Sequence, residues 1–391
     1  MPLALYPGST LPRDGDAGTL VGRVWRPDRR GPSVVVARDG ALHDISAAAP
    51  TVRDLCETAD PATLARSTAG EVVGSIADIL ANTPRDRRDT ARPWLLAPID
   101  LQAIKAAGVT FAVSMLERVV EEQARGDPEK ALEFRASVVE IIGDDLSRLQ
   151  PGSEEAAELK RVLIERGAWS QYLEVGIGPD AEVFTKAPVL SAVGTGFEIG
   201  VHPHSTWNNP EPEIALVVSS AGRIVGATLG NDVNLRDFEG RSALLLSKAK
   251  DNTASAALGP FLRLFDGTFT LDDVRRADVR LTVRGDEGFE MKDVSSMGRI
   301  SRDPADLVAQ TIGPNHQYPD GFVLYLGTMF APTKDRQAPG QGFTHEVGDL
   351  VTVASEQLGA LTNRVVRCPE AEPWTFGIAD LMRNLAARKL I

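Results

Sequence analysis

Three carboxylates near the middle of the chain have the residue types and spacing that suit a hard metal ion. Glu211 and Glu213 form an acid-x-acid pair, and Asp232 follows later. The intervening residues predict a strand over 214–218, a turn and a strand over 223–227, so a hairpin would return Asp232 to the pair. Residues two apart share one face of an extended segment. Converging carboxylates raise one another's pKa unless a cation such as Mg²⁺, Ca²⁺ or Mn²⁺ binds them.

The residues around these acids would hold them in place. Pro210 and Pro212 fix φ in the acidic segment, and Gly230 and Asn231 predict a turn that aims the short side chain of Asp232. The alternative is an ordinary acidic pair on an exposed strand, which needs no metal. Both interpretations stay open on the residues alone.

Composition narrows the classes of partner. The chain has 391 residues, a net charge of −12, 43% hydrophobic residues and two cysteines. This length permits two or three domains, and the acidity disfavours nucleic acids and anionic membranes as partners. No apolar run is long enough for a membrane span, the first residues do not resemble a secretory signal, and two distant cysteines fit a reducing cytoplasm. An anionic small molecule would need local cations at its site.

Periodicity predicts two domains. Residues 1–95 form a small N-terminal domain, and residues 96–391 form a larger one with a helical insert over about 113–167. In the small domain we expect strands and then helices, at 19–25, 33–37, 42–45, 51–57 and 70–82. Within the insert, the sequence predicts two helices over 113–126 and 129–148. It predicts a third helix that starts after Ser153 as N-cap and ends before Gly167.

The larger domain is predicted to be rich in short strands beyond residue 182. We expect strands near 183–185, 213–219, 223–229, 278–284, 321–327 and 349–354. Helices are predicted around 238–250, 303–311 and within 376–389. The sequence therefore predicts an α+β protein.

The acidic motif and its neighbours resemble the fumarylacetoacetate hydrolase superfamily. The resemblance rests on Glu211-Pro212-Glu213, the run 230–237, Lys250 ahead of Leu258-Gly259-Pro260, the run 184–188 and Gly327-Thr328. It implies Mg²⁺, with Mn²⁺ or Ca²⁺ as substitutes, held by Glu211, Glu213 and Asp232. It also implies a mixed β-roll of the β-clip kind, the fumarylacetoacetase C-terminal fold, behind a smaller N-terminal domain, in a homodimer or homotetramer.

A narrower resemblance is to the bacterial 2-keto-3-deoxy-sugar-acid dehydratases of that superfamily. It rests on the runs 108–114, 169–175, 208–213 and 238–252. It implies a hydro-lyase that dehydrates a small anionic 2-keto-3-deoxypentonate, the xylonate or arabinonate form, to 2,5-dioxopentanoate in oxidative pentose catabolism. In such a substrate the carboxylate and ketone oxygens can chelate the ion, which makes the C3 hydrogens acidic.

The resemblance also assigns roles to residues outside the acidic motif. Lys250, Glu117 and Thr328 are the expected catalytic residues, and Lys186, Ser114, Arg236 and Thr328 are expected to bind substrate. Four of these residues have a plainer alternative: Lys250 and Lys186 could be surface lysines, Glu117 a charge on a helix face, and Thr328 a threonine at the end of a strand.

One departure from the superfamily pattern bears on the reaction. Many of its hydrolases carry a water-activating histidine where this chain has Ser114, three residues before Glu117. A hydroxyl cannot replace imidazole as a base near neutral pH, which favours elimination over C–C hydrolysis. The alternatives are an acylpyruvate or diketo-acid hydrolase, with an imidazole from His202, His204, His316 or His345, and a non-enzymatic sugar-acid or metal-binding protein.

Overall fold

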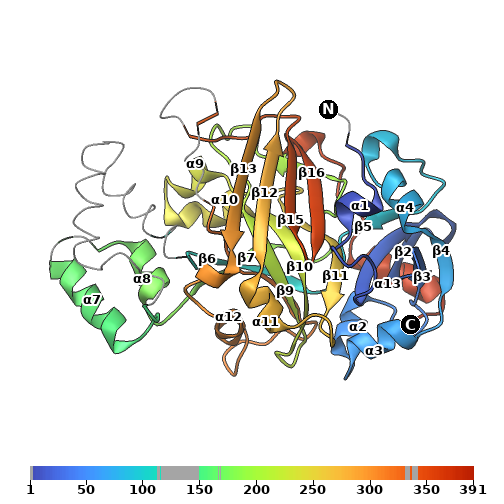
Figure 1. Cartoon of the computed structure of the whole chain (residues 1–391), viewed down its shortest axis with the longest axis horizontal. Coiled ribbons are helices and arrows are strands. Elements are labelled where there is room, and N and C mark those ends of the chain that lie inside the picture. Colours follow the sequence, from blue (N-terminus) through green and yellow to red (C-terminus); the bar gives the residue numbers. More distant parts are fainter. Residues whose placement is uncertain are drawn as a thin grey trace.

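The computed structural model describes residues 3–111, 115, 149–165, 167, 169–330, 335–336 and 342–391. Apart from Met115, the predicted helices over 113–126 and 129–148 lie outside these residues. The predicted α+β class is confirmed, because an 11-stranded and a 5-stranded sheet, both mixed, carry helices at their edges (Figure 1). Within the described part of the chain, none of the helices is long and apolar enough to cross a membrane.

The first four strands extend the large sheet. They are β1 (Leu20–Arg26), β2 (Gly31–Arg38), β3 (Ala41–Asp44) and β4 (Glu71–Ser75). The sheet runs β4-β3-β2-β1-β11-β10-β9-β14-β6-β7, and β5 (Trp94–Leu96) pairs with β1. Because β1 pairs directly with β11, the N-terminal segment shares hydrogen bonds with the remaining chain. The domain boundary near residue 95 stays a prediction.

Short helices cover this N-terminal segment: α1 (Pro7–Thr10), α2 (Val52–Glu57), α3 (Pro61–Ser67) and α4 (Ile76–Asn82). The prediction of one helix over 70–82 is wrong in its first part, because residues 71–75 form β4 against β3. The β-branched pair Val72-Val73 suits a strand, and the Ser75 hydroxyl then accepts from the Asp78 N–H to start α4. The C-terminal α13 (Ile378–Ala387) contacts β2.

The centre of the large sheet consists of β11 (Ala256–Leu264), β10 (Ile224–Asp232), β9 (Pro212–Val218), β14 (Phe322–Tyr325), β6 (Ala103–Gly108) and β7 (Glu182–Ala187). The predicted hairpin is confirmed: β9 and β10 pair antiparallel, with Glu213 opposite Gly230. Gly222 supplies the positive φ that the turn requires. Every residue of β9 is buried, so the sheet is covered on both faces there.

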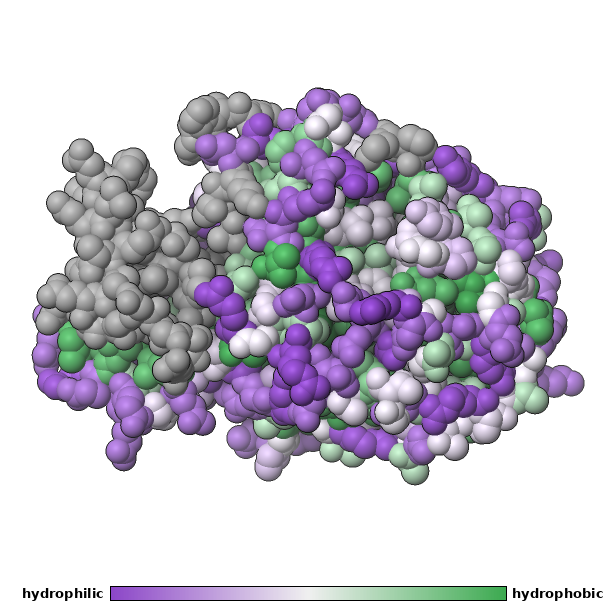
Figure 2. All heavy atoms as spheres, viewed as in Figure 1, coloured by the Kyte–Doolittle hydropathy of each residue, from purple (hydrophilic) through white to green (hydrophobic). Residues whose placement is uncertain are grey.

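The second sheet runs β13-β12-β15-β16-β8 and packs against the first. Its strands are β8 (Glu198–Val201), β12 (Asp278–Arg284), β13 (Glu290–Ser296), β15 (Leu350–Ser355) and β16 (Gly359–Arg367). Leu216 and Leu229 of the first sheet share an apolar cluster with Leu281 and Val353 of the second. The main core therefore lies between the sheets. Hydrophilic residues cover much of the described surface on the face shown in Figure 2.

The remaining helices join or flank the strands: α7 (Glu154–Glu165), α8 (Gln171–Ile177), α9 (Arg236–Glu239), α10 (Leu246–Lys250), α11 (Leu271–Arg276) and α12 (Pro304–Thr311). The prediction for α7 is confirmed, since the Ser153 hydroxyl accepts from the Ala156 N–H and Gly167 follows with positive φ. A continuous helix over 238–250 is wrong, because the chain breaks after Glu239 at Gly240 and Ser242 caps a new turn.

Candidate metal centre

The three acidic side chains singled out in the sequence converge. Glu211 precedes β9, Glu213 lies on it and Asp232 ends β10, and each offers a carboxylate oxygen within 4.8 Å of the others. Within the described residues this is the single group of its kind that could hold a metal ion. The three side chains are buried, and the Asp232 N–H donates to the Glu211 carbonyl at 3.0 Å. The predicted convergence is confirmed.

Two buried lysines face these carboxylates. Lys250 Nζ lies 2.5 Å from Glu211 Oε2 and 3.1 Å from Asp232 Oδ2. Lys186 Nζ lies 2.7 Å from Asp232 Oδ1 and also donates to the backbone carbonyls of Val233 and Lys250. Neither lysine is a solvated surface charge. Lys250 comes from the end of α10, and Lys186 comes from β7.

Burial and the neighbouring charges both shift the pKa values of this cluster. Burial raises the pKa of Glu213 well above its usual value, and the nearby Asp232 and Glu211 carboxylates raise it further. Burial works to lower the pKa of Lys250, but Asp232 and Glu211 outweigh burial and raise it. Burial lowers the pKa of Lys186 despite Asp232. Three carboxylates thus face two ammonium groups, and an all-oxygen donor set of this charge fits a hard divalent ion.

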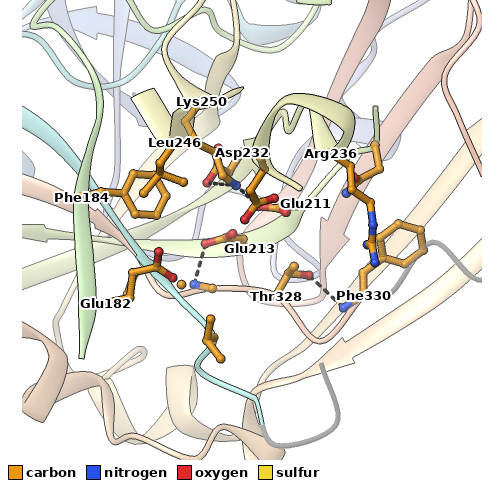
Figure 3. Close-up of a pocket in the computed structure, with 16 residues that line it drawn as sticks. Glu182, Phe184, Glu211, Glu213, Asp232, Arg236, Leu246, Lys250, Thr328 and Phe330 are labelled. Carbon is orange, nitrogen blue, oxygen red and sulfur yellow. Dashed lines mark hydrogen bonds and ion pairs between the residues drawn. The ribbon is translucent and has the colours of Figure 1, made fainter. Parts of the chain in front are cut away.

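A pocket opens over the triad (Figure 3). Glu182 and Phe184 of β7 lie on one side of it, and Arg236 and Phe330 lie on the other. The Gly327 N–H donates to Glu213 Oε2 at 2.6 Å, and both residues line the pocket. The lining residues are Ala107, Gly108, Val109, Glu182, Phe184, Asn209, Glu211, Glu213, Asp232, Arg236, Glu239, Leu246, Lys250, Gly327, Thr328 and Phe330.

The other predicted site residues take different places. Thr328 lines the pocket just after β14, where Gly327 has a φ of 88°, and its hydroxyl accepts from the Phe330 N–H. Arg236 lines the pocket with its guanidinium 4.7 Å from the centre of the Trp207 ring. Lys186 lies behind Asp232 instead of among the lining residues. Ser114 and Glu117 lie outside the described residues, so their roles stay predictions.

The structure adds an acid that sequence reasoning missed. Glu182, Phe184 and Lys186 alternate along β7, and all three side chains serve the same site. Alternation of a carboxylate, a ring and an ammonium group was the available signal. Glu182 fits where it does because Gly108 lies opposite, and a Cβ on Gly108 would come 1.9 Å from Glu182 Oε2.

The lining residues of this pocket include no histidine in the part of the chain that the structure describes. His202 and His204 line a separate cavity. His345 is buried beside Asp349, and the His316 ring packs on Tyr318. These placements give no support to an imidazole base from these four residues.

The family model for the fumarylacetoacetate (FAA) hydrolase C-terminal domain matches residues 171–366, which span the triad and both lysines. The chain belongs to this family. Among curated relatives, a probable 2-keto-3-deoxyxylonate dehydratase of Haloferax volcanii is 27% identical over 335 residues, which are 85% of this chain and 94% of that protein. A 2-dehydro-3-deoxy-D-arabinonate dehydratase of Saccharolobus solfataricus is 29% identical over 187 residues, 47% of this chain and 58% of that protein.

Solved structures agree on the fold. A 2-keto-3-deoxy-D-arabinonate dehydratase complexed with magnesium and 2,5-dioxopentanoate aligns with a TM-score of 0.61 at 19% identity, covering 89% of this chain and 99% of that one. Its apo form aligns with the same TM-score at 20% identity and the same coverage. The expected fumarylacetoacetase-type fold is confirmed.

Proposed function

We propose that this chain is a Mg²⁺-dependent hydro-lyase that converts a 2-keto-3-deoxypentonate to 2,5-dioxopentanoate. The observation that carries the proposal is the buried triad of Glu211, Glu213 and Asp232 with Lys250 at its side, open to a pocket. Both curated relatives are dehydratases of 2-keto-3-deoxy sugar acids by name, which supports the reaction class. A place in oxidative pentose catabolism follows from that substrate.

The triad would hold Mg²⁺, with Mn²⁺ or Ca²⁺ as possible substitutes, and the bound ion would polarise the ketone of a 2-keto acid. Lys250 places a fixed positive charge beside the triad, where it can stabilise negative charge that develops on the substrate. Arg236 and Thr328 supply donors at the pocket wall for the carboxylate and hydroxyl groups. These roles rest on position in the pocket.

Dehydration needs a proton removed from C3 and a proton delivered to the departing C4 hydroxyl. Loss of a C5 proton and tautomerisation then give the aldehyde. Glu182 is a pocket acid on the same side as Phe184 and across from Arg236, and we propose that it moves one of these protons. Glu117 remains the other expected acid or base. Glu182→Gln and Glu117→Gln, compared under the same conditions, separate the two assignments by their losses in kcat.

The competing function is C–C hydrolysis of an acylpyruvate or diketo acid by the same chelating site. The sequence disfavours it, since Ser114 replaces the histidine that would activate water. The non-enzymatic alternative is also less favoured, because pocket, acids and ammonium groups are all present in one place.

The deciding experiment incubates the protein with Mg²⁺ and 2-keto-3-deoxy-D-xylonate, and separately with the arabinonate form. Mass spectrometry should show a product about 18 mass units lighter than the substrate, the mass of one water, and an aldehyde reagent should detect it. Release of pyruvate with a second fragment would show hydrolytic cleavage instead and overturn the proposal.

Two further expectations belong with this function. We propose a homodimer or homotetramer, as the family resemblance implies; light scattering that gives 41.9 kDa, the mass of one chain, would contradict it. We also propose a cytoplasmic location, supported by the two free cysteines, Cys56 and Cys368.

A further inference from the structure

A second cavity of about 220 Å³ lies beside the α9–α10 segment and shares no lining residue with the acidic pocket. The α10 helix contributes to both pockets, because Lys250 contacts the acidic triad and Lys248 lines the second cavity. The residues that line the second cavity are His202, His204, Asp237, Phe238, Arg241 and Lys248. Four of these six side chains carry or can carry positive charge.

The cations gather around the Phe238 ring. The Arg241 guanidinium lies 4.5 Å from the ring centre and the Lys248 ammonium 5.7 Å from it. The His202 ring packs edge-on at 5.2 Å, and the His204 ring lies 5.3 Å from His202. Within the described residues, neither Arg241 nor Lys248 forms an ion pair with a carboxylate. Their N–H donors are therefore available to a ligand.

The one carboxylate in the cavity is already engaged. Asp237 Oδ1 accepts from the Ser205 hydroxyl at 2.8 Å and from the Phe238 N–H, and Oδ2 accepts from the Thr206 N–H at 2.9 Å. These bonds hold Asp237 against the 205–206 loop. Its charge still opposes an anion, so the two permanent cations and two imidazoles must outweigh it.

A metal ion is a poorer occupant than an anion. Two histidines and an aspartate are common transition-metal ligands, but His202, His204 and Asp237 do not offer ligand atoms within 4.8 Å of one another. The positive charges of Arg241 and Lys248 would repel a metal ion, whereas their N–H groups can donate hydrogen bonds to an oxyanion.

We propose that this cavity binds a tetrahedral oxyanion that carries two negative charges, as inorganic phosphate, sulfate or a phosphate ester does. The Arg241 fork and Lys248 supply charge-assisted donors. The His202 and His204 rings also line the cavity, and His202 Nδ1 accepts from the His204 N–H at 3.1 Å. The chain has a net charge of −12, so a cluster of basic side chains makes this part of the surface locally positive on a negatively charged protein. The bound anion would rest on α10, two residues from Lys250.

The test uses the full chain without metal or sugar acid, so it does not depend on the proposed dehydratase activity. Sulfate is titrated by isothermal calorimetry at constant ionic strength. We expect saturable binding with one site per chain. Arg241→Gln with Lys248→Gln should weaken sulfate binding at least tenfold. Lys389→Gln is the control and should leave binding unchanged, because Lys389 is an exposed lysine two residues beyond the end of α13. Absence of saturable binding, or equal binding by the double variant, overturns the proposal.

The pH dependence is a second arm. Sulfate stays doubly charged between pH 6 and 8, so a change in affinity reports the protein groups. His202 faces Lys248, His204 and Asp237, and burial with the first two lowers its pKa. We expect tighter binding at pH 6 than at pH 8 and a smaller pH effect in His202→Gln; an equal affinity at both pH values contradicts the histidine contribution. Phosphate and glycerol 3-phosphate titrated in parallel tell a free ion from an ester.

Discussion

Lys186 Nζ lies 2.7 Å from Asp232 Oδ1, and both side chains are buried behind the acidic pocket. Lys250 approaches the other oxygen of the same carboxylate at 3.1 Å. Asp232 is therefore held by one ammonium group at each oxygen. This arrangement fixes the side chain and makes the two lysines the counter-charges of the cluster when no metal is bound.

Lys186→Met should destabilise the metal-free protein by about 3 kcal/mol, because removal of one partner leaves a buried charge uncompensated. Saturating Mg²⁺ should recover part of that loss, since the ion adds positive charge at the same carboxylates. Urea unfolding with and without Mg²⁺ measures both effects. The control is Lys105→Met on the neighbouring β6, where the ammonium donates to the Thr185 hydroxyl. If Lys186→Met lowered the unfolding free energy by the same amount with and without Mg²⁺, the charge of Lys186 would not be coupled to the metal centre.

Glu213→Gln should abolish Mg²⁺-dependent turnover and the thermal stabilisation that Mg²⁺ provides, because one anionic ligand is gone. In the metal-free state at pH 7 the variant should be at least as stable as the parent protein. The pKa of Glu213 is raised in the folded state, so its ionisation opposes folding as pH rises above about 4.5. Melting curves with and without Mg²⁺ test this. Glu290→Gln, in a side chain that is 40% exposed, is the control.

Glu182→Gln should lower kcat by about 10²–10⁴-fold if the carboxylate transfers a proton. Deuterium exchange at C3, followed by NMR in heavy water, shows which proton is involved. Loss of exchange points to C3, whereas exchange without elimination points to the departing hydroxyl. Unchanged kcat would remove Glu182 from the mechanism while leaving the dehydratase assignment intact.

Gly108→Ala should act in the same direction, because the new Cβ would lie 1.9 Å from Glu182 Oε2 and displace the carboxylate. The fold should survive, since the end of a side chain can move. Gly313→Ala, where nothing lies within 4 Å of the new Cβ, is the matched control. Equal activity of both variants would show that the position of Glu182 does not matter.

Asp266→Asn should remove an acid-sensitive contribution to stability. Burial works to raise the pKa of Asp266, but hydrogen bonds from Thr19 and Thr268 and the charge of Arg66 lower it to about 2. The stabilisation is present above the ordinary value of 3.8 and is lost as pH falls toward 2. The variant should lose about 2 kcal/mol at pH 7. Its unfolding free energy should vary less between pH 4 and 2; parallel curves would contradict this.

Local signals predicted the hairpin and several other strands of the large sheet, but they missed β11 at its centre. β9, β10 and their turn follow from strand-turn-strand composition, whereas β11 was missed. All nine residues of β11 are buried, and it contains Gly259 and Pro260, so it shows neither alternation nor a clean strand signal. The helix over 238–250 failed for a local reason, the break at Gly240.

Within the site, the sequence identified the acids and Lys250 through their motifs. It could not place Lys186 behind Asp232, because that contact joins residues on separate strands and depends on how β7 lies across the sheet. For Glu182, the alternation with Phe184 and Lys186 places the three side chains on one face of β7, but which face meets the site depends on the pairing of β7 with β6, where Gly108 lies opposite Glu182. Spacing along a chain predicts which residues share a face, and tertiary packing decides which faces meet.

The contact of α13 with β2 has a consequence for synthesis. Asn384 donates to the carbonyls of Arg29 and Arg30, and Arg388 reaches the Ser33 hydroxyl, so some of the last residues cover some of the first strands. β1 likewise pairs with β11, which lies more than 200 residues later in the sequence. During translation the first 95 residues would leave the ribosome long before either contact can form. The edge of β1 that pairs with β11 would then stay unpaired until residues 256–264 are synthesised, and residues 378–388 would reach β2 only later.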